Sequence, residues 1–246
     1  MRGEKFAAQH QWDRAFFLGF ILVGWAAIFL GFYSSVADRF TGRADYAAPP
    51  ILVVHVFSFV GWMCLLTMQA LLINLKRVDI HKRMGLIGAL LIPIMVVSGI
   101  GSEIESQRFY SVKDPVNSQF FIMPITTMLM FAILSTAALV KRKDSPSHKR
   151  LILLATTVIL SAGFLRWWGD AMYTSLGDEF LGTYLRNYLG PDLLIAAAIT
   201  YDLVTRGRIH RVYVFGTAFI VVIQIAATKL YHSALWPPIA RAIAGI

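Results

Sequence analysis

Three histidines stand where an imidazole could hold a metal or a cofactor. His81 and His148 each precede Lys-Arg and an apolar run, and His55 lies inside an apolar run. The dipole at a helix N-terminus disfavours the imidazolium ion. It therefore favours the neutral imidazole that binds haem iron or accepts a hydrogen bond. The sequence thus predicts cofactor contacts at His55, His81 and His148, with haem b or a quinone as the bound group.

The spacing of these histidines separates them into two groups. His81 follows His55 by 26 residues, which corresponds to about 39 Å along a continuous helix. The two imidazoles therefore cannot bind one ion. Histidines near opposite ends of helices suit a protein that passes electrons from one side of a membrane to the other. A plainer interpretation stays open, because a histidine followed by Lys and Arg also anchors a helix at a membrane interface.

Four further polar residues are expected near the end of the molecule that holds His55. They are Arg166, Asp170, Asp192 and His232. Ionisable groups next to membrane spans face other helices or water more often than lipid. Together they would form a polar cluster able to hold a small molecule, although the same residues could serve only as interface anchors.

Other kinds of site are excluded or lack a signal. The only cysteine is Cys64, so neither a disulfide within the chain nor a cysteine-based metal cluster can form, and we predict no metal-ion site. The sequence contains no P-loop, GxGxxG, HExxH, CxxCH or GxSxG motif. Whether the protein is an enzyme stays open at this point.

The elements that position these residues are predicted to be membrane-spanning helices. Hydrophobic residues make up 57% of the 246 residues and charged residues only 15%, against about 25% in soluble domains. Runs of apolar residues approach the length of about 20 that crosses a bilayer. We therefore predict an all-α, polytopic membrane protein with one transmembrane domain, residues 1–246, and seven spans, six being the alternative. The predicted spans are 15–33, 51–75, 84–100, 120–140, 151–168, 191–204 and 212–231.

The distribution of basic residues predicts the orientation. With the N-terminus inside, the inner segments hold 15 of the Lys and Arg residues and the outer segments hold 8. Cytoplasmic loops carry such an excess, so the N-terminus is expected in the cytoplasm and the C-terminus outside. The net charge of +9 is then explained by inner loops, and no nucleic-acid partner is expected. The longest outer loops are predicted at 34–50, 101–119 and 169–190.

Several motifs resemble those of a group of uncharacterised bacterial integral membrane proteins with about seven spans. The likeness covers residues from about 50 to the end of the chain. The motifs are His55…Trp62…Gln69, His81-Lys-Arg-Met-Gly, His148-Lys-Arg-Leu-Ile-Leu-Leu-Ala-Thr and Thr205-Arg-Gly-Arg-Ile-His210. A more distant likeness, in the placement of histidines, is to membrane proteins of the cytochrome b561 type and to haem-related oxidase assembly proteins. The resemblance implies the bacterial cytoplasmic (inner) membrane and histidines that serve haem near helix ends.

Three functions are compatible with these features. The first is electron transfer, or assembly of an electron-transfer protein, with haem or quinone at the histidines. The second is a non-enzymatic accessory or scaffold subunit that packs against a larger membrane complex. The third is a small-molecule transporter or lipid-modifying enzyme that uses the outer polar cluster. All three have the lipid bilayer as partner, and a Soret band would single out the first.

Overall fold

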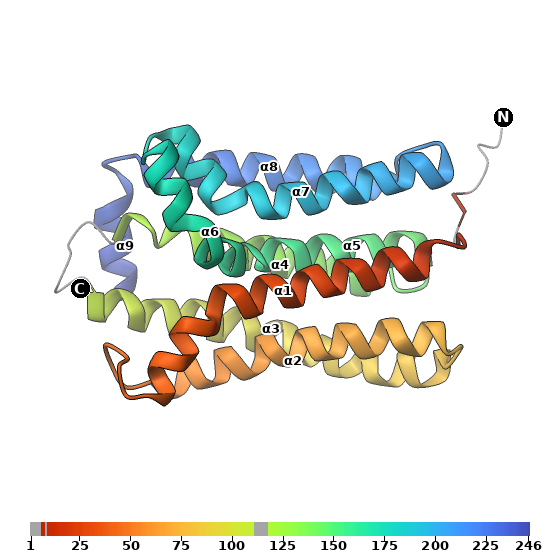
Figure 1. The fold of residues 1–246 in the computed structure, drawn as a ribbon, viewed down its shortest axis with the longest axis horizontal. Helices are drawn as coiled ribbons and strands as arrows, with labels where there is room; N and C mark the ends of the chain where they lie inside the picture. The colour runs from red at the N-terminus through yellow and green to blue at the C-terminus, as the bar shows by residue number, and fades with distance from the viewer. Residues whose placement is uncertain (1–5, 8, 111–117) are drawn as a thin grey trace.

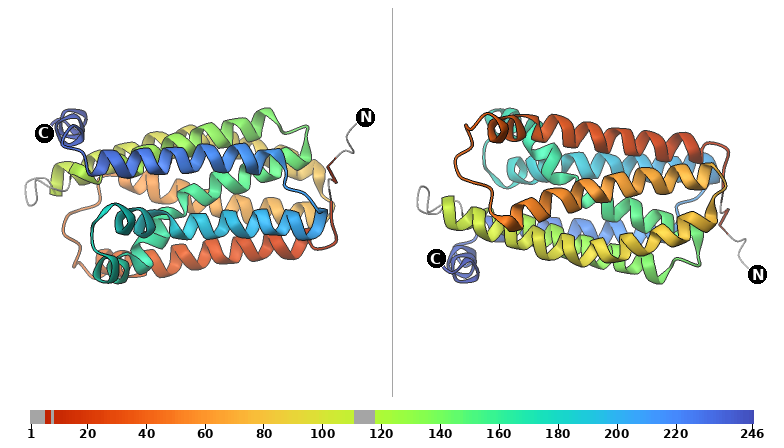
Figure 2. Two further views of the ribbon diagram at one scale, coloured as in Figure 1. Left: turned by 90° about the horizontal axis from the view of Figure 1, so that it is seen from above. Right: turned by 90° about the horizontal axis from the view of Figure 1, so that it is seen from below.

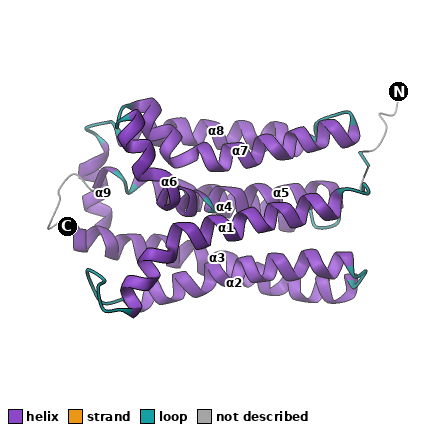
Figure 3. Ribbon diagram, viewed as in Figure 1, coloured by secondary structure: helices purple, strands orange, loops and turns teal. Residues whose placement is uncertain are grey.

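The computed structural model describes residues 6, 7, 9–110 and 118–246, and within them it contains helices and no strands (Figure 3). This confirms the all-α class. The helices are α1 Asp13–Phe40, α2 Pro50–Asn74, α3 Val78–Tyr110, α4 Ile122–Val140, α5 Ser145–Ile159, α6 Ser161–Leu176, α7 Phe180–Arg206, α8 Arg211–Tyr231 and α9 Trp236–Ala244.

The long helices lie roughly parallel to one axis and form an elongated bundle (Figures 1 and 2). One end of the bundle, here called the N-terminal end, carries the start of α1 and the α2–α3, α4–α5 and α7–α8 turns (Figure 1). The opposite end, here called the far end, carries the α1–α2, α6–α7 and α8–α9 connections. The chain thus runs from one end of the bundle to the other repeatedly, as a polytopic membrane protein does.

Six helical stretches within the described residues are long and apolar enough to cross a membrane. They are α1, α2, α3, α4, α8 and the stretch Ser145–Leu176, which joins α5 and α6. Large apolar side chains such as Leu22, Phe57 and Phe215 are exposed on the outside of the bundle. Exposed apolar surface on this scale suits contact with lipid.

The helices extend further than the predicted spans. The span 84–100 is part of α3, which continues to Tyr110, and the span 191–204 is the second half of α7, which begins at Phe180. Much of the predicted outer loops 101–119 and 169–190 is therefore helical, although 111–117 lies outside the described residues. The prediction ended these helices too early because a hydropathy scan rejects polar residues, whereas the helix ends here bury polar side chains such as Gln107 and Asn187 against other helices.

The predicted span 151–168 comprises two helices, since α5 ends at Ile159 and α6 begins at Ser161. The helix α7 is continuous through Pro191. Proline removes one backbone hydrogen bond from a helix interior, and neighbouring helices can compensate for the loss in a membrane. The interruption precedes α6 and Pro191 lies in α7, and these two helices meet at the far end of the bundle (Figure 1).

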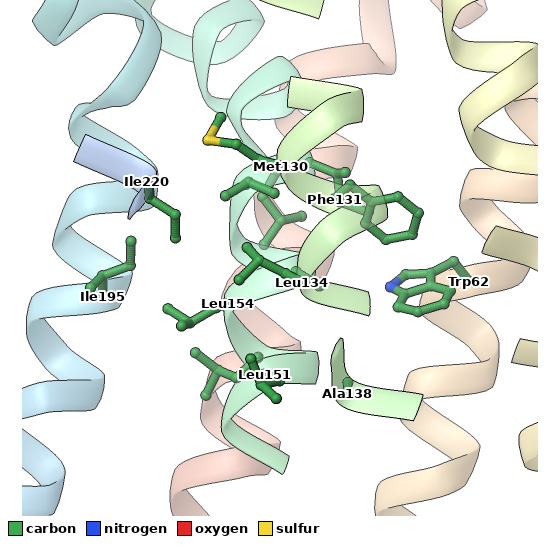
Figure 4. Close-up of a cluster of buried hydrophobic side chains, with 14 of the residues drawn as sticks. Trp62, Met130, Phe131, Leu134, Ala138, Leu151, Leu154, Ile195 and Ile220 are labelled. Atoms are coloured by element: carbon green, nitrogen blue, oxygen red, sulfur yellow. The ribbon is translucent and has the colours of Figure 1, made fainter. Parts of the chain in front are cut away.

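The hydrophobic core lies around α4 and α5, which neighbouring helices surround (Figures 1 and 4). Phe131, Leu134 and Leu154 are almost fully buried there. The indole N–H of Trp62 in α2 donates a hydrogen bond of 3.1 Å to the Thr156 hydroxyl of α5. An interhelical hydrogen bond of this kind satisfies a polar group that lipid could not.

Two glycines let α1 and α6 approach until their backbones touch. A Cβ atom added at Gly31 would lie 2.2 Å from the carbonyl oxygen of Gly163, and one added at Gly163 would lie 2.8 Å from the carbonyl oxygen of Ala27. Small residues permit such close packing between membrane helices. The contact fixes α6 against α1 next to the pocket described below.

Candidate functional site

A polar pocket of about 530 Å³ opens at the far end of the bundle. Its walls come from α1, α6 and α7, together with Phe120 just before α4. The lining residues are Gly31, Ser34, Ser35, Phe120, Leu165, Arg166, Gly169, Asp170, Tyr173 and Arg186. The volume falls in the range of small-molecule sites, about 300–1,000 Å³. Two arginines and one carboxylate in its wall suit a small charged ligand.

Arg166 is the exposed cation of this pocket. Its guanidinium lies over the Phe32 ring, 4.7 Å from the centroid, and donates a hydrogen bond of 3.1 Å to the Ala162 carbonyl. Within the described part of the chain no carboxylate lies within 4.0 Å of it. Since a guanidinium has five N–H donors in a planar fork, most of its donors are available to an anion in the pocket.

Arg186 is held by neighbours on its own side of the pocket. It pairs with Asp178 at 2.8 Å, and its guanidinium lies 5.3 Å from the centroid of the Tyr173 ring. The hydroxyl of Tyr231 also donates to Asp178 over 3.3 Å. Arg186 is therefore largely neutralised, which leaves Arg166, beside the Asp170 carboxylate, as the unpaired cation among the described residues of the pocket wall.

Buried polar groups continue from the pocket toward α3 and α2. The Glu103 carboxylate attracts Arg166 electrostatically and accepts a hydrogen bond of 2.8 Å from the Gln107 amide. The His55 imidazole also interacts electrostatically with Arg166, and its ring centroid lies 4.2 Å from that of Phe59. The structure thus gathers His55, Glu103 and Arg166 in the far half of the bundle.

His55 presents a buried nitrogen without a partner. Its Nδ1 has no hydrogen-bond partner among the described residues, while its neighbours Val54 and Phe57 are exposed. The position of His55 suggests three acidic partners. Among the described residues it forms no hydrogen bond with any of them, namely Glu103, Asp170 and Asp192. A buried polar atom normally has a partner, so a bound molecule at His55 stays a prediction.

The four residues of the predicted outer cluster do not lie together. Arg166 and Asp170 line the same pocket. Asp192 instead accepts hydrogen bonds from the Tyr184 hydroxyl (3.1 Å) and the Gln224 amide (3.0 Å) between α7 and α8. His232 ends α8, where its ring lies 4.9 Å from that of Tyr231. Sequence position alone could not separate them, because all four lie near the outer ends of the predicted spans, whereas Asp192 in fact lies in the middle of α7.

The other two candidate histidines lie at the N-terminal end of the bundle and interact electrostatically with each other. His148 Nδ1 lies 2.8 Å from the Ala138 carbonyl oxygen and is therefore the protonated nitrogen. In the neutral form of His148, Nε2 then carries the lone pair. Nδ1 of His81 is buried without a hydrogen-bond partner among the described residues. The backbone carbonyl of His81 accepts a hydrogen bond of 3.2 Å from the side-chain amide of Gln69.

The sequence interpretation missed a cluster of five charged residues at the N-terminal end. Asp13 of α1 accepts from Lys149 of α5 at 2.8 Å and from Arg206 of α7 at 2.7 Å. Arg150 donates through Nε to Asp202 over 2.8 Å and forms a second bond to the same carboxylate through its terminal nitrogen. We call these residues the ion cluster. It ties α1, α5 and α7 together.

Aromatic rings and a histidine cover the ion cluster. The Phe6 ring lies 4.5 Å from the Arg150 guanidinium and 5.3 Å from that of Arg208. His210 borders the cluster and caps α8 by accepting a hydrogen bond from the Val212 N–H at 3.2 Å. Burial lowers the pKa of His210, and the positive charge of Arg150 lowers it further. Both effects favour the neutral imidazole, which its acceptor role at Val212 requires.

The described residues contain no group of three or more His, Cys, Asp or Glu side chains that could hold a metal ion. Comparison of the chain with protein-family models, with curated proteins and with solved structures finds no match.

Proposed function

We propose that the chain is a seven-span protein of the bacterial cytoplasmic membrane with its N-terminus inside. The six apolar stretches and α7, which runs beside them between the two ends of the bundle, together make seven crossings (Figure 1). Their turns bring the basic segments around Arg77, Lys143 and Arg208 to the N-terminal end. The positive-inside rule supports the cytoplasm for that end.

A topology test uses reporters fused after single residues. A fusion of green fluorescent protein after Lys143 is expected to fluoresce and one after Gly42 to stay dark, because the protein folds in the cytoplasm and not outside. Alkaline phosphatase at the same two positions should give the reverse pattern. Identical readings at both positions would refute the proposed threading.

We further propose that the protein is a transporter that takes a small anion from the outer side into the pocket around Arg166. The pocket carries this proposal, because it combines a suitable volume with an exposed arginine that has no paired carboxylate among the described residues. An arginine fork binds carboxylate or phosphate groups through two parallel hydrogen bonds. Glu103, which attracts Arg166, would restrain the guanidinium without filling its donors.

The rest of the bundle is compatible with a state that is closed toward the N-terminal end. The packed core around Phe131 and Leu154 lies between the pocket and that end, and the ion cluster joins three helices there. Transporters commonly bind substrate beside interrupted helices and expose it to one side at a time. The α5–α6 interruption at Leu160 and Pro191 of α7 lie along the helices that line the pocket.

Replacing Arg166 with Gln tests the anion site. Thermal unfolding of the detergent-solubilised protein is measured against increasing inorganic phosphate, acetate and succinate at constant ionic strength. We expect a saturable rise in melting temperature with at least one anion, and an affinity at least about tenfold lower in R166Q, since hydrogen bonds to charged groups contribute strongly. R43Q, which removes an exposed arginine outside the pocket, is the control. If the wild type and R166Q respond alike to all three anions, the pocket is not an anion site.

Electron transfer through haem b or quinone is the second candidate, and the pair His81 and His148 favours it. The hydrogen bond from His148 Nδ1 to Ala138 leaves Nε2 free to bind iron or to meet a quinone oxygen. Such a second hydrogen bond commonly orients a ligating histidine. His55, at the opposite end, would then serve a separate outer site. Bound haem would supply one-electron chemistry, while the histidines would hold and orient it.

The absorption spectrum decides this second candidate. If haem b is the bound group, the purified protein shows a Soret band, and H81A or H148A removes the band while the protein still inserts into the membrane. H10A, which changes a histidine outside the helices, should leave the band intact. A colourless parent protein, or an unchanged spectrum in both variants, would exclude haem at these residues.

A further inference from the structure

A second cavity lies at the opposite end of the bundle from the anion pocket and has a different character. It is an open groove of about 610 Å³ between α4, α5 and α8. Its walls are almost entirely apolar, with Ala132, Thr136, Leu151 and Val212 among them, and Lys141 is the one charged residue among the described residues that line it. Such a groove suits a hydrocarbon chain with a charged group at one end.

The dimensions of the groove match one leaflet of a bilayer. It extends along α4 from Ala132 to the C-cap residue Lys141, nine residue steps or about 14 Å at 1.5 Å per step. Half of a hydrocarbon core of about 30 Å is about 15 Å. An acyl chain laid along α4 would therefore run from the middle of the bilayer to the level of the headgroups.

The charge at the end of the groove selects the headgroup. Lys141 is exposed immediately after α4 ends, and Arg142 and Lys143 follow it in the α4–α5 turn. The nearest acid, Asp144, accepts a hydrogen bond of 2.6 Å from the Ser147 hydroxyl. The headgroup end of the groove is thus positive, and charge complementarity favours an anionic lipid over a zwitterionic one.

We propose that this groove is a binding site for one anionic phospholipid, with an acyl chain against α4, α5 and α8 and its phosphate at Lys141. The site is separate from the anion pocket in position, lining and ligand. If the groove binds no lipid, the proposed transport of a small anion is unaffected. If the pocket at Arg166 binds no anion, the proposed lipid site is likewise unaffected.

Native mass spectrometry of the delipidated protein tests the site. The probes are palmitoyl-oleoyl phosphatidylglycerol and the phosphatidylcholine with the same chains, and the measurement is the apparent Kd of each. Wild-type protein should bind phosphatidylglycerol about fivefold more tightly, the factor expected for one lysine at a membrane surface. K141Q should abolish this preference, whereas K143Q, which changes the same residue type in the same turn outside the groove, should retain it.

Filling the groove tests the position of the acyl chain. T136W places a large side chain in the groove wall and should weaken the binding of both lipids. L129W, on the exposed surface of the same helix outside the groove, should not. The proposal is overturned if the wild type binds both lipids equally, if K141Q and K143Q lose the preference to the same extent, or if T136W and L129W behave alike. Circular dichroism of each variant verifies that it is folded.

Discussion

Replacing Asp202 with Ala is expected to lower the free energy of unfolding by about 3–5 kcal/mol, because it strands the buried Arg150 guanidinium. The two side chains are only 1% and 2% exposed, and both guanidinium contacts to the carboxylate would be lost. The N–H of His210 would also lose its acceptor at 3.3 Å. Denaturant or thermal unfolding in detergent micelles measures the loss.

Two comparisons show whether burial of the charge is the cause. R43A breaks an exposed pair with Asp38 and should cost no more than about 1 kcal/mol. The double variant D202A/R150M removes both charges and should recover much of the stability, since a buried ion pair is often replaceable by apolar side chains. A loss in D202A no larger than that in R43A would show that the Arg150–Asp202 pair contributes little to the fold.

The second large effect is expected at Gly31. Gly31→Ala places a methyl group 2.2 Å from the Gly163 carbonyl oxygen, a backbone atom that cannot rotate away. The helices α1 and α6 must then separate, and overpacking of this kind costs about 1–3 kcal/mol. The same change should weaken anion binding, because Gly31 and Arg166 line one pocket from these two helices.

Gly19→Ala is the matched control in the same helix. No atom lies within 4 Å of a Cβ added there, so the intrinsic helix preference for Ala over Gly should leave stability unchanged or raise it by up to about 1 kcal/mol. Thermal unfolding of both variants, together with the anion titration, gives the comparison. Equal melting temperatures for the two variants would contradict a close α1–α6 contact.

Hydropathy predicts the central part of this fold well and its helix ends poorly. The apolar middle of each helix is obvious in the sequence, since lipid demands it over about 20 residues. The helix ends are less obvious in the sequence. The continuation of α3 to Tyr110 and the start of α7 at Phe180 escape a hydropathy scan because those ends bury polar side chains against protein. A hydropathy scan cannot distinguish a polar residue that faces water from one that faces another helix.

The candidate site was predictable only as a set of residue types. Arg166 and Asp170 are one helical turn apart, so their common location follows from local geometry. Asp192 is also predicted near the outer end of a span. In the structure its carboxylate instead accepts hydrogen bonds from Tyr184 and Gln224. The Arg150–Asp202 pair could not be predicted, because the two residues are 52 positions apart and nothing local in the sequence connects them.

The ion cluster also constrains the order of events during biosynthesis. Asp13 is made near the start of the chain, but Lys149 follows it by 136 residues and Arg206 by 193. At about 5–20 residues per second, the ribosome reaches Arg206 about 10–40 s after Asp13. Lys149 is made within that interval, and until then Asp13 has neither of these two basic partners. The ion cluster is therefore completed late, and nascent chains that end before α7 should be more sensitive to proteases around Asp13 than the full chain.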